Sequence, residues 1–248
     1  MSLEVNNSCL DEQHISRKSI WDIFSHELMH HLPYGTLSVA CALMLLSMIH
    51  VFFTASIVES LSHVHDHAHN HSGSCGMQSG MDILFHSFHF THILFAASGA
   101  MVTFYRYSKN IMAGVMVGLV SSTIFCTLSD VLLPYFAGNL LGVSMDLHIC
   151  FKSELANILP FLLVGIINGL IISRGKEQHS DHHSASLHFF HTFISAMAAI
   201  FYAIGHGLSD FHAYFGMFFM LMLIAIVIPC TLSDVVVPIL WARMVKNK

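Results

Sequence analysis

Long apolar runs, separated by short polar stretches, dominate the pattern along this 248-residue chain. Several runs approach or exceed the roughly 20 residues that a helix needs to cross a bilayer. Helices are expected because lipid offers no partner to the open backbone of a strand. The pattern therefore predicts an all-α integral membrane protein with six transmembrane helices. Their expected bounds are 33–60, 84–105, 111–136, 155–173, 187–205 and 213–241.

Three polar motifs occur twice and in the same order. The first, E-L-x-x-x-L-P, aligns Glu27 with Glu154, and the second is an H-x-x-H pair that begins expected spans two and five. The third, CTLSDVLLP at 126–134, returns as CTLSDVVVP at 230–238. Each copy contains three spans, an odd number, so the second copy enters the membrane from the opposite side. The sequence thus predicts two inverted-topology three-helix repeats, an arrangement in which secondary transporters place their substrate sites between the repeats.

The duplication divides the chain into three parts. Residues 1–32 are expected to form an N-terminal cytoplasmic segment with an amphipathic approach helix. Residues 33–137 would form the first repeat, with a His-rich outer loop at 62–80. Residues 138–248 would form the second repeat, with a His-containing inner loop at 174–186.

Basic residues are expected on one side of the membrane, with a single exception. Cytoplasmic loops carry an excess of Lys and Arg. Under the six-span arrangement Lys152 alone lies on the far side. The residues on the side of the termini are Arg17, Lys18, Arg106, Lys109, Arg174, Lys176, Arg243, Lys246 and Lys248. We therefore expect a multi-pass protein of the plasma membrane or a bacterial inner membrane, with both termini in the cytoplasm.

Composition agrees with this prediction and adds an unusual abundance of histidine. The chain is 54% apolar and 10% charged, whereas about a quarter of a soluble domain is charged. Its 21 histidines outnumber its 10 Lys plus Arg residues, and histidine is the commonest metal ligand. The six cysteines form no C-x-x-C pair, so no disulfide framework is predicted. The expected partners are the lipid bilayer and metal ions, without nucleic acid, and a homo-oligomer stays open.

The CTLSD motif places a cysteine and an aspartate on one helix face, Cys126 with Asp130 and Cys230 with Asp234. The apolar run continues past both motifs, and a carboxylate at such a depth usually faces a cavity or a partner. A proline four residues later disfavours a straight helix, so spans three and six should be interrupted there. Ser-Asp could cap a broken half-helix, or Cys and Asp could ligate a cation. The repeated cysteine, which a cap does not need, favours a softer metal ion.

Histidines at helical spacing extend this candidate metal site. Residues three apart share a helix face and can bind one ion. The two pairs are His86 with His89, and His188 with His191. His92 extends only the first pair, because the second copy has Ile194 at the matching position.

Position along the spans predicts two separate clusters, one in each leaflet. The outer cluster would contain His86, His89, Cys126, Asp130 and Glu154. The inner cluster would contain His188, His191, Cys230, Asp234 and Glu27. The two glutamates would accept a proton as the ion leaves, because ligation by carboxylate and imidazole is linked to pH. Two equivalent clusters would suit an ion that passes from one site to the next.

The outer loop reads SHVHDHAHNHSGSCGMQSGM, with histidines at alternate positions. These are His63, His65, His67, His69 and His71. Tracts of this kind are typical of metal binding. Imidazole and carboxylate donors suit zinc, nickel, cobalt or ferrous iron, so a divalent transition metal is the expected substrate.

HELMH at 26–30 favours a different function. On a helix, H-E-x-x-H supplies two zinc ligands and a general base, which would make the chain an intramembrane zinc metalloprotease. The second copy keeps Glu154 but has Ser153 and Asn157 in place of the histidines. A bis-histidine haem protein and a metal sensor are further alternatives. The leading hypothesis is a secondary-type transporter of a divalent transition metal, which alternates access between its inverted repeats; a transporter is thus favoured over an enzyme, and that choice stays open.

Overall fold

The computed structural model describes residues 19–62, 73–149, 154–175, 181–208 and 211–246. Every regular element in these ranges is helical. The α-helices are α2 (Ile20–Ser62), α3 (Gly73–Tyr107), α4 (Ile111–Thr127), α5 (Leu133–Leu140), α7 (Leu155–Arg174), α8 (Asp181–Gly205), α9 (Phe215–Thr231) and α10 (Val237–Lys246). Two π-helical turns, η1 (Leu128–Leu132) and η3 (Leu232–Val236), and a 3₁₀ turn, η2 (Phe211–Tyr214), join them.

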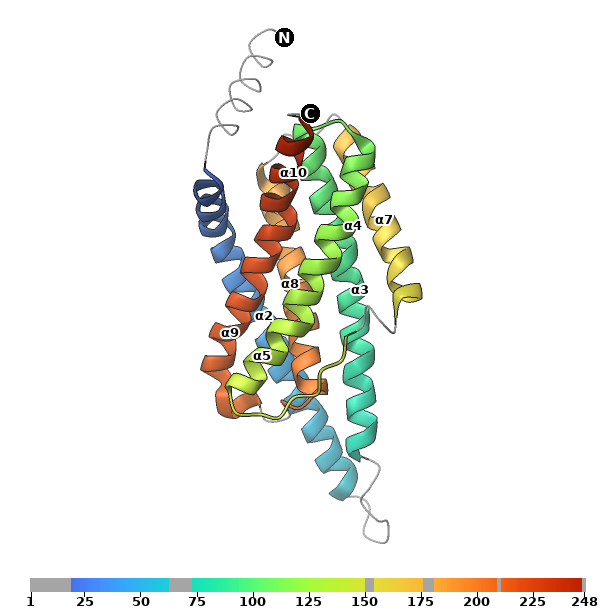
Figure 1. The fold of residues 1–248 in the computed structure, drawn as a ribbon. Coiled ribbons are helices and arrows are strands. Elements are labelled where there is room, and N and C mark those ends of the chain that lie inside the picture. The colour runs from blue at the N-terminus through green and yellow to red at the C-terminus, as the bar shows by residue number, and fades with distance from the viewer. Residues whose placement is uncertain (1–18, 63–72, 150–153, 176–180, 209–210, 247–248) are drawn as a thin grey trace.

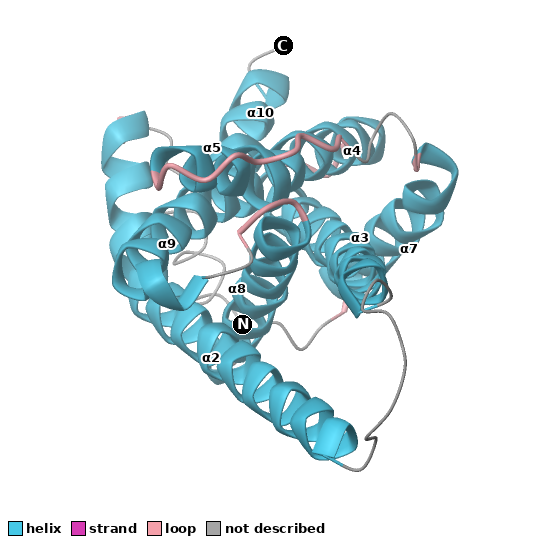
Figure 2. Ribbon diagram, turned by 90° about the horizontal axis from the view of Figure 1, so that it is seen from below, coloured by secondary structure: helices cyan, strands magenta, loops and turns pink. Residues whose placement is uncertain are grey.

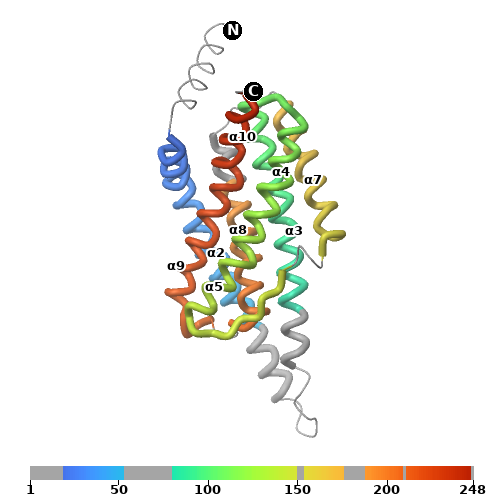
Figure 3. Tube along the Cα trace, in the orientation of Figure 1, coloured from blue at the N-terminus to red at the C-terminus, as the bar shows by residue number. Residues whose placement is uncertain are grey.

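These helices form one elongated bundle whose long rods alternate in direction (Figure 1). α4 runs through η1 into α5, and α9 runs through η3 into α10, so each pair forms one rod (Figure 3). Seen along the bundle, α8 lies near the middle with the other rods around it (Figure 2). Burial agrees with this arrangement. In α8, 67% of the apolar 18-residue stretch is buried inside the bundle, whereas the buried share of such a stretch in the other candidate spans is 44% or less. The middle of the molecule is thus built on α8.

Five segments are long and apolar enough to cross a membrane. They are Ile20–Phe52, Ile111–Leu140, Leu155–Arg174, His188–Gly205 and Phe211–Lys246. The outer face of α7 shows why lipid is the expected surroundings, since Leu163, Ile167 and Ile171 recur every fourth residue and are all exposed. The all-α multi-pass membrane class is confirmed. α3 is not among the five, so the sixth span and the inverted repeat stay predictions.

The first rod begins earlier than the sequence predicts. α2 is a single 43-residue helix that starts at Ile20 and continues through Pro33. The HELMH motif therefore lies within the helix itself. α2 contacts α8 and α9, and Ser38 on α2 shares a 2.7 Å hydrogen bond with Thr192 on α8.

The expected interruptions after CTLSD take the form of widened turns in continuous rods. In each copy a backbone N–H bonds the carbonyl five residues earlier, Leu133 to Leu128 and Val237 to Leu232. The next residue is proline in both copies, and proline lacks the N–H that an α-helix would use. π turns of this kind are rare and are frequent at functional sites. The two turns therefore lie at corresponding points of the two copies.

α7 packs tightly against α3 through glycines. At Gly169 an added Cβ would lie 2.7 Å from the Ser98 carbonyl oxygen, and at Gly165 it would collide with the Leu94 carbonyl. The two glycines are four residues apart, the small-residue spacing that lets membrane helices approach closely. α3, which carries His89, contacts α8 as well as α7.

Candidate metal centre

Asp130, in the first π turn, lies at the centre of a buried hydrogen-bond network. Its side chain is fully buried. Oδ1 accepts hydrogen bonds from the hydroxyls of Ser129 (2.7 Å) and Ser195 (3.0 Å). Oδ2 contacts Nδ1 of His89 at 2.8 Å and Nδ1 of His92 at 2.7 Å. An ionised carboxylate only accepts hydrogen bonds, so these four groups act as donors and leave Asp130 little capacity to bind an ion itself.

The bond to Asp130 directs the other nitrogen of His92 toward sulfur. With Nδ1 donating, the lone pair of a neutral imidazole lies on Nε2. Nε2 lies 3.8 Å from the Cys126 sulfur and 3.7 Å from the Cys230 sulfur. A carboxylate that holds the far nitrogen of a histidine is the common outer partner of a metal-ligating imidazole. His92 is therefore arranged as a ligand, with Asp130 as its positioning residue.

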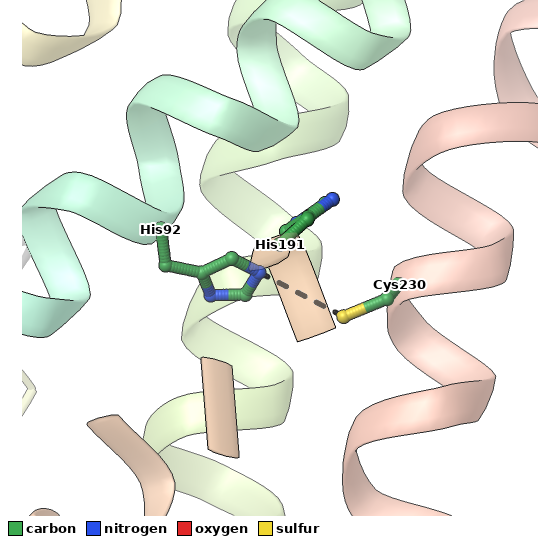
Figure 4. Close-up of side chains that lie close together, drawn as sticks. All are labelled: His92, His191 and Cys230. Carbon is green, nitrogen blue, oxygen red and sulfur yellow. Dashed lines mark hydrogen bonds between the residues drawn. The ribbon is translucent and has the colours of Figure 1, made fainter. Parts of the chain in front are cut away.

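Three buried side chains from three helices form a group that could hold a metal ion (Figure 4). His92 comes from α3, His191 from α8 and Cys230 from α9. Their ligand atoms all lie within 4.8 Å of one another. Nitrogen and sulfur donors in this number are typical of zinc sites that keep an open position.

His191 forms a second histidine–aspartate pair, this time with Asp234 of the second π turn. Nδ1 of His191 lies 2.6 Å from Oδ2 of Asp234. The remaining polar atoms, Nε2 of His191 and Oδ1 of Asp234, are buried and have no hydrogen-bond partner. Buried polar atoms without a partner are costly, so these two atoms would gain from a bound cation or water. α3 leaves room for this carboxylate, because Gly99 has no side chain and an added Cβ would lie 3.2 Å from Asp234.

A small cavity adjoins this second pair. Its volume is about 10 Å³, and it is lined by His31, His188, His191, Thr192, Val227, Cys230, Thr231 and Asp234. A space of this size holds roughly one water molecule. It is large enough for a single ion and far too small for a porphyrin, so nothing at this site favours the haem alternative.

The two CTLSD motifs meet at one centre, which corrects the prediction of one cluster per leaflet. His92 reaches the cysteines of both copies, Cys126 and Cys230. Ser195 of the second copy bonds Asp130 of the first. Toward the bundle ends, His188 lies three residues before His191, and His86 lies six residues before His92. Both motifs lie near the middle of their rods, Ile111–Leu140 and Phe211–Lys246, because these rods extend past the expected span ends at 136 and 241.

Ser-Asp does not cap a helix in either copy. Ser129 donates to the Cys126 carbonyl at 3.2 Å, and the oxygens of Asp234 contact only His191 or have no hydrogen-bond partner. The oxygens of Asp130 contact serine and histidine side chains instead. The cap interpretation is therefore wrong.

His86 and Glu154 line a separate cleft of about 530 Å³ between α3 and α7. Nδ1 of His86 bonds the Asp82 carbonyl at 2.7 Å, and Glu154 accepts a hydrogen bond from Asn157. The cleft also contains Phe90, which packs in the core beside Cys126. These two predicted ligands are thus near each other but apart from the central group.

The HELMH histidines face outward from α2. His26 and His30 are exposed, and Glu27 contacts His26 at 3.5 Å. The next residue, His31, is buried instead and meets His188. HELMH does not appear among the metal-binding groups found in the described residues, so the protease alternative gains no support.

The predicted outer histidines lie outside the described residues. These are His63, His65, His67, His69 and His71. Their proposed metal binding stays a prediction.

Sequence reasoning gave too little weight to His92 and did not consider Ser195 or His31 as parts of the site. Repetition within the chain guided the choice of ligands, and His92 has no counterpart in the second copy. Its signal was the third position of H-x-x-H-x-x-H, which continues one helix face. Ser195 carries no such signal, because only the packing of α8 on η1 brings it to Asp130.

Comparisons with protein-family models, curated proteins and solved structures found no match for the chain. Its function is therefore inferred from the geometry of the centre.

Proposed function

We propose that this protein is a secondary-type membrane transporter of a divalent transition metal ion of the zinc, nickel, cobalt or iron class. The ion binds to His92, His191 and Cys230. The observation that carries the proposal is that three buried ligand atoms from three helices lie within 4.8 Å of one another.

The chemistry of the donors narrows the metal. Two imidazoles and a thiol form a borderline-soft set, which suits zinc and cobalt better than the harder magnesium or calcium. Cys126 adds a second sulfur 3.8 Å from His92. We therefore expect zinc and cobalt to bind more tightly than ferrous iron.

The origin of the ligands favours transport over a fixed structural site. His92 belongs to the first copy of the motifs, and His191 and Cys230 belong to the second. A relative movement of the two halves would break this ligand set and release the ion. Inverted-repeat transporters use such an interface for alternating access. The six-span, inverted arrangement is part of this proposal.

Binding and flux together test the proposal. Purified protein in detergent is loaded with Zn²⁺ or Co²⁺ and analysed for bound metal, and proteoliposomes with a metal-sensitive dye inside report flux. His92→Asn is the informative variant, because its amide can still donate to Asp130 while the metal-facing nitrogen is lost. Cys230→Ser removes the sulfur. Cys41→Ser is the matched control, since Cys41 is a free cysteine on α2 outside the centre.

We expect wild type and Cys41→Ser to bind and transport the metal, and both site variants to lose flux and tight binding. Wild-type protein that binds metal without flux would make the chain a sensor. Unchanged binding in both site variants would overturn the assignment of the centre.

A further inference from the structure

We propose that His31 and His188 form, with His191 and Asp234, a second metal position next to the central one, and that the ion passes between the two around His191. This inference rests on the proposed function and deepens it, because it assigns the path by which the ion leaves or reaches the centre.

His31 and His188 meet with nitrogen atoms facing each other. Nε2 of His31 lies 3.2 Å from Nδ1 and 3.4 Å from Nε2 of His188. Nδ1 of His31 lies 2.7 Å from the Glu27 carbonyl oxygen, to which it can only donate. A neutral His31 therefore carries its lone pair on Nε2. Metal-ligating histidines commonly donate their other ring N–H to a backbone carbonyl, which orients the ring as it is oriented here.

The cavity of about 10 Å³ joins this pair to the centre. It is lined by both of these histidines and also by His191, Asp234 and Cys230. His191 and Asp234 are the residues with buried atoms that lack a hydrogen-bond partner. The space, the facing nitrogens and the unsatisfied atoms thus occur at one point, as a cation position requires.

His191 belongs to both positions. It is one of the three residues of the central group, and it also lines the cavity beside His31 and His188. An ion that exchanges Cys230 and His92 for His31 and His188 would keep one ligand throughout. This exchange avoids a fully unligated ion within the membrane.

In the described residues, the repeat gives His31 no histidine counterpart at the other end of the path. The repeat alignment that pairs Glu27 with Glu154 places Ile158 opposite His31. The other end has the cleft of Asp82, His86 and Glu154 instead, where oxygen donors join imidazole. The two halves of the path therefore differ in chemistry although the motifs are repeated.

Cobalt distinguishes the two positions because thiolate ligation gives Co²⁺ a near-ultraviolet charge-transfer band that nitrogen and oxygen ligands do not give. The test uses full-length protein and Co²⁺ alone, with binding measured by metal analysis and flux measured in proteoliposomes. His31→Asn keeps a donor for the Glu27 carbonyl and removes Nε2. His188→Gln removes the imidazole that faces His31. His212→Asn is the control, since His212 is exposed on η2.

We expect His31→Asn and His188→Gln to retain the thiolate band and lose at least about tenfold in flux, the scale on which supporting metal contacts act. Cys230→Ser should lose the band but retain weak Co²⁺ binding. The double variant His31→Asn with Cys230→Ser should lose this weak binding as well. Wild-type flux in both histidine variants would overturn the second position. Binding by the double variant equal to that of Cys230→Ser would overturn it as well. A wild-type protein without Co²⁺ or without the band would refute the central site instead, so the two failures are distinguishable.

Discussion

Nδ1 of His92 lies 2.7 Å from Oδ2 of Asp130, and this bond determines which nitrogen of His92 faces the two cysteine sulfurs. The carboxylate of Asp130 also accepts from two serines and His89, so all its partners are donors. An asparagine at position 130 would present amide N–H groups either to the two histidines or to the two serines, all of which donate in the wild-type protein.

Asp130→Asn should lower metal affinity although Asp130 is not a ligand. If the amide nitrogen faces the histidines, His92 must accept at Nδ1 and carry its proton on Nε2, where it blocks the metal. We expect affinity to fall about 10–100-fold, as for other outer partners of metal ligands, and stability to fall by about 1–3 kcal/mol through unsatisfied buried groups. Titration with Zn²⁺ and chemical unfolding measure the two effects.

Asp146→Asn is the control for this variant, because Asp146 is exposed in the loop after α5. Asp146→Asn should leave the Zn²⁺ affinity and the free energy of unfolding unchanged. An Asp130→Asn protein with wild-type affinity would show that Asp130 does not orient His92.

Metal should stabilise the fold most strongly when the central ligands are intact. A ligand that binds the native state alone stabilises it by about 2.7 kcal/mol at 100 times its dissociation constant. We therefore expect Zn²⁺ to raise the melting temperature of wild type and Cys41→Ser, and a chelator to reverse the rise. In His92→Asn the rise with Zn²⁺ should be much smaller, because only the weaker second position is left. A rise in His92→Asn as large as that in wild type would place the stabilising ion elsewhere.

The fold class could be predicted from the sequence because membrane helices follow from apolar length alone. The repeated CTLSD motifs correctly indicated Asp130 and Asp234 as buried polar residues with partners. The prolines after them indicated a departure from the α-helix, and the structure gives that departure the form of π turns.

The roles of the residues could not be predicted in the same way. Whether Asp130 ligates an ion or orients His92 depends on which side chains from α3 and α8 reach it. The separation into leaflets failed because the rods continue to Leu140 and Lys246, past the expected span ends, so both CTLSD motifs lie near mid-rod. Contacts such as that of His31 with His188 depend on α2 packing against α8, which the repeat pattern does not encode.

Gly169→Ala should destabilise the bundle, whereas Gly80→Ala should not. At position 169 a Cβ would lie 2.7 Å from the Ser98 carbonyl oxygen and 2.8 Å from the Met101 Cβ, so α7 must move away from α3. We expect a loss of about 1–3 kcal/mol, typical of overpacking. At position 80 no atom lies within 4 Å, and alanine is up to about 1 kcal/mol better than glycine within a helix.

Thermal unfolding in detergent compares the two glycine variants. Equal stability of Gly169→Ala and wild type would mean that α7 is not held by close contact with α3. Metal affinity should change with Gly169→Ala as well, because α3 carries His92.

The predicted orientation and sixth span can be tested together by cysteine labelling. α3 begins at one end of the bundle and ends at the other, beside the end of α10 (Figure 1). The end of the bundle where α3 and α10 finish carries the basic residues Arg106, Lys109 and Arg243. Basic residues mark the cytoplasmic side. Lys109→Cys should therefore react with a membrane-impermeant maleimide only from the cytoplasm, and Gly80→Cys only from the opposite side.

The labelling is done in a background without the native cysteines outside the buried pair, and Ser144→Cys serves as the control. Ser144 is exposed in the loop after α5, so it should be labelled from the side opposite to Lys109→Cys whether or not α3 spans the membrane. Labelling of Gly80→Cys and Lys109→Cys from one side would exclude α3 as a span and with it the inverted repeat. Labelling of all three with the sides exchanged would keep the repeat and reverse the orientation, so that the His31–His188 position would face away from the cytoplasm.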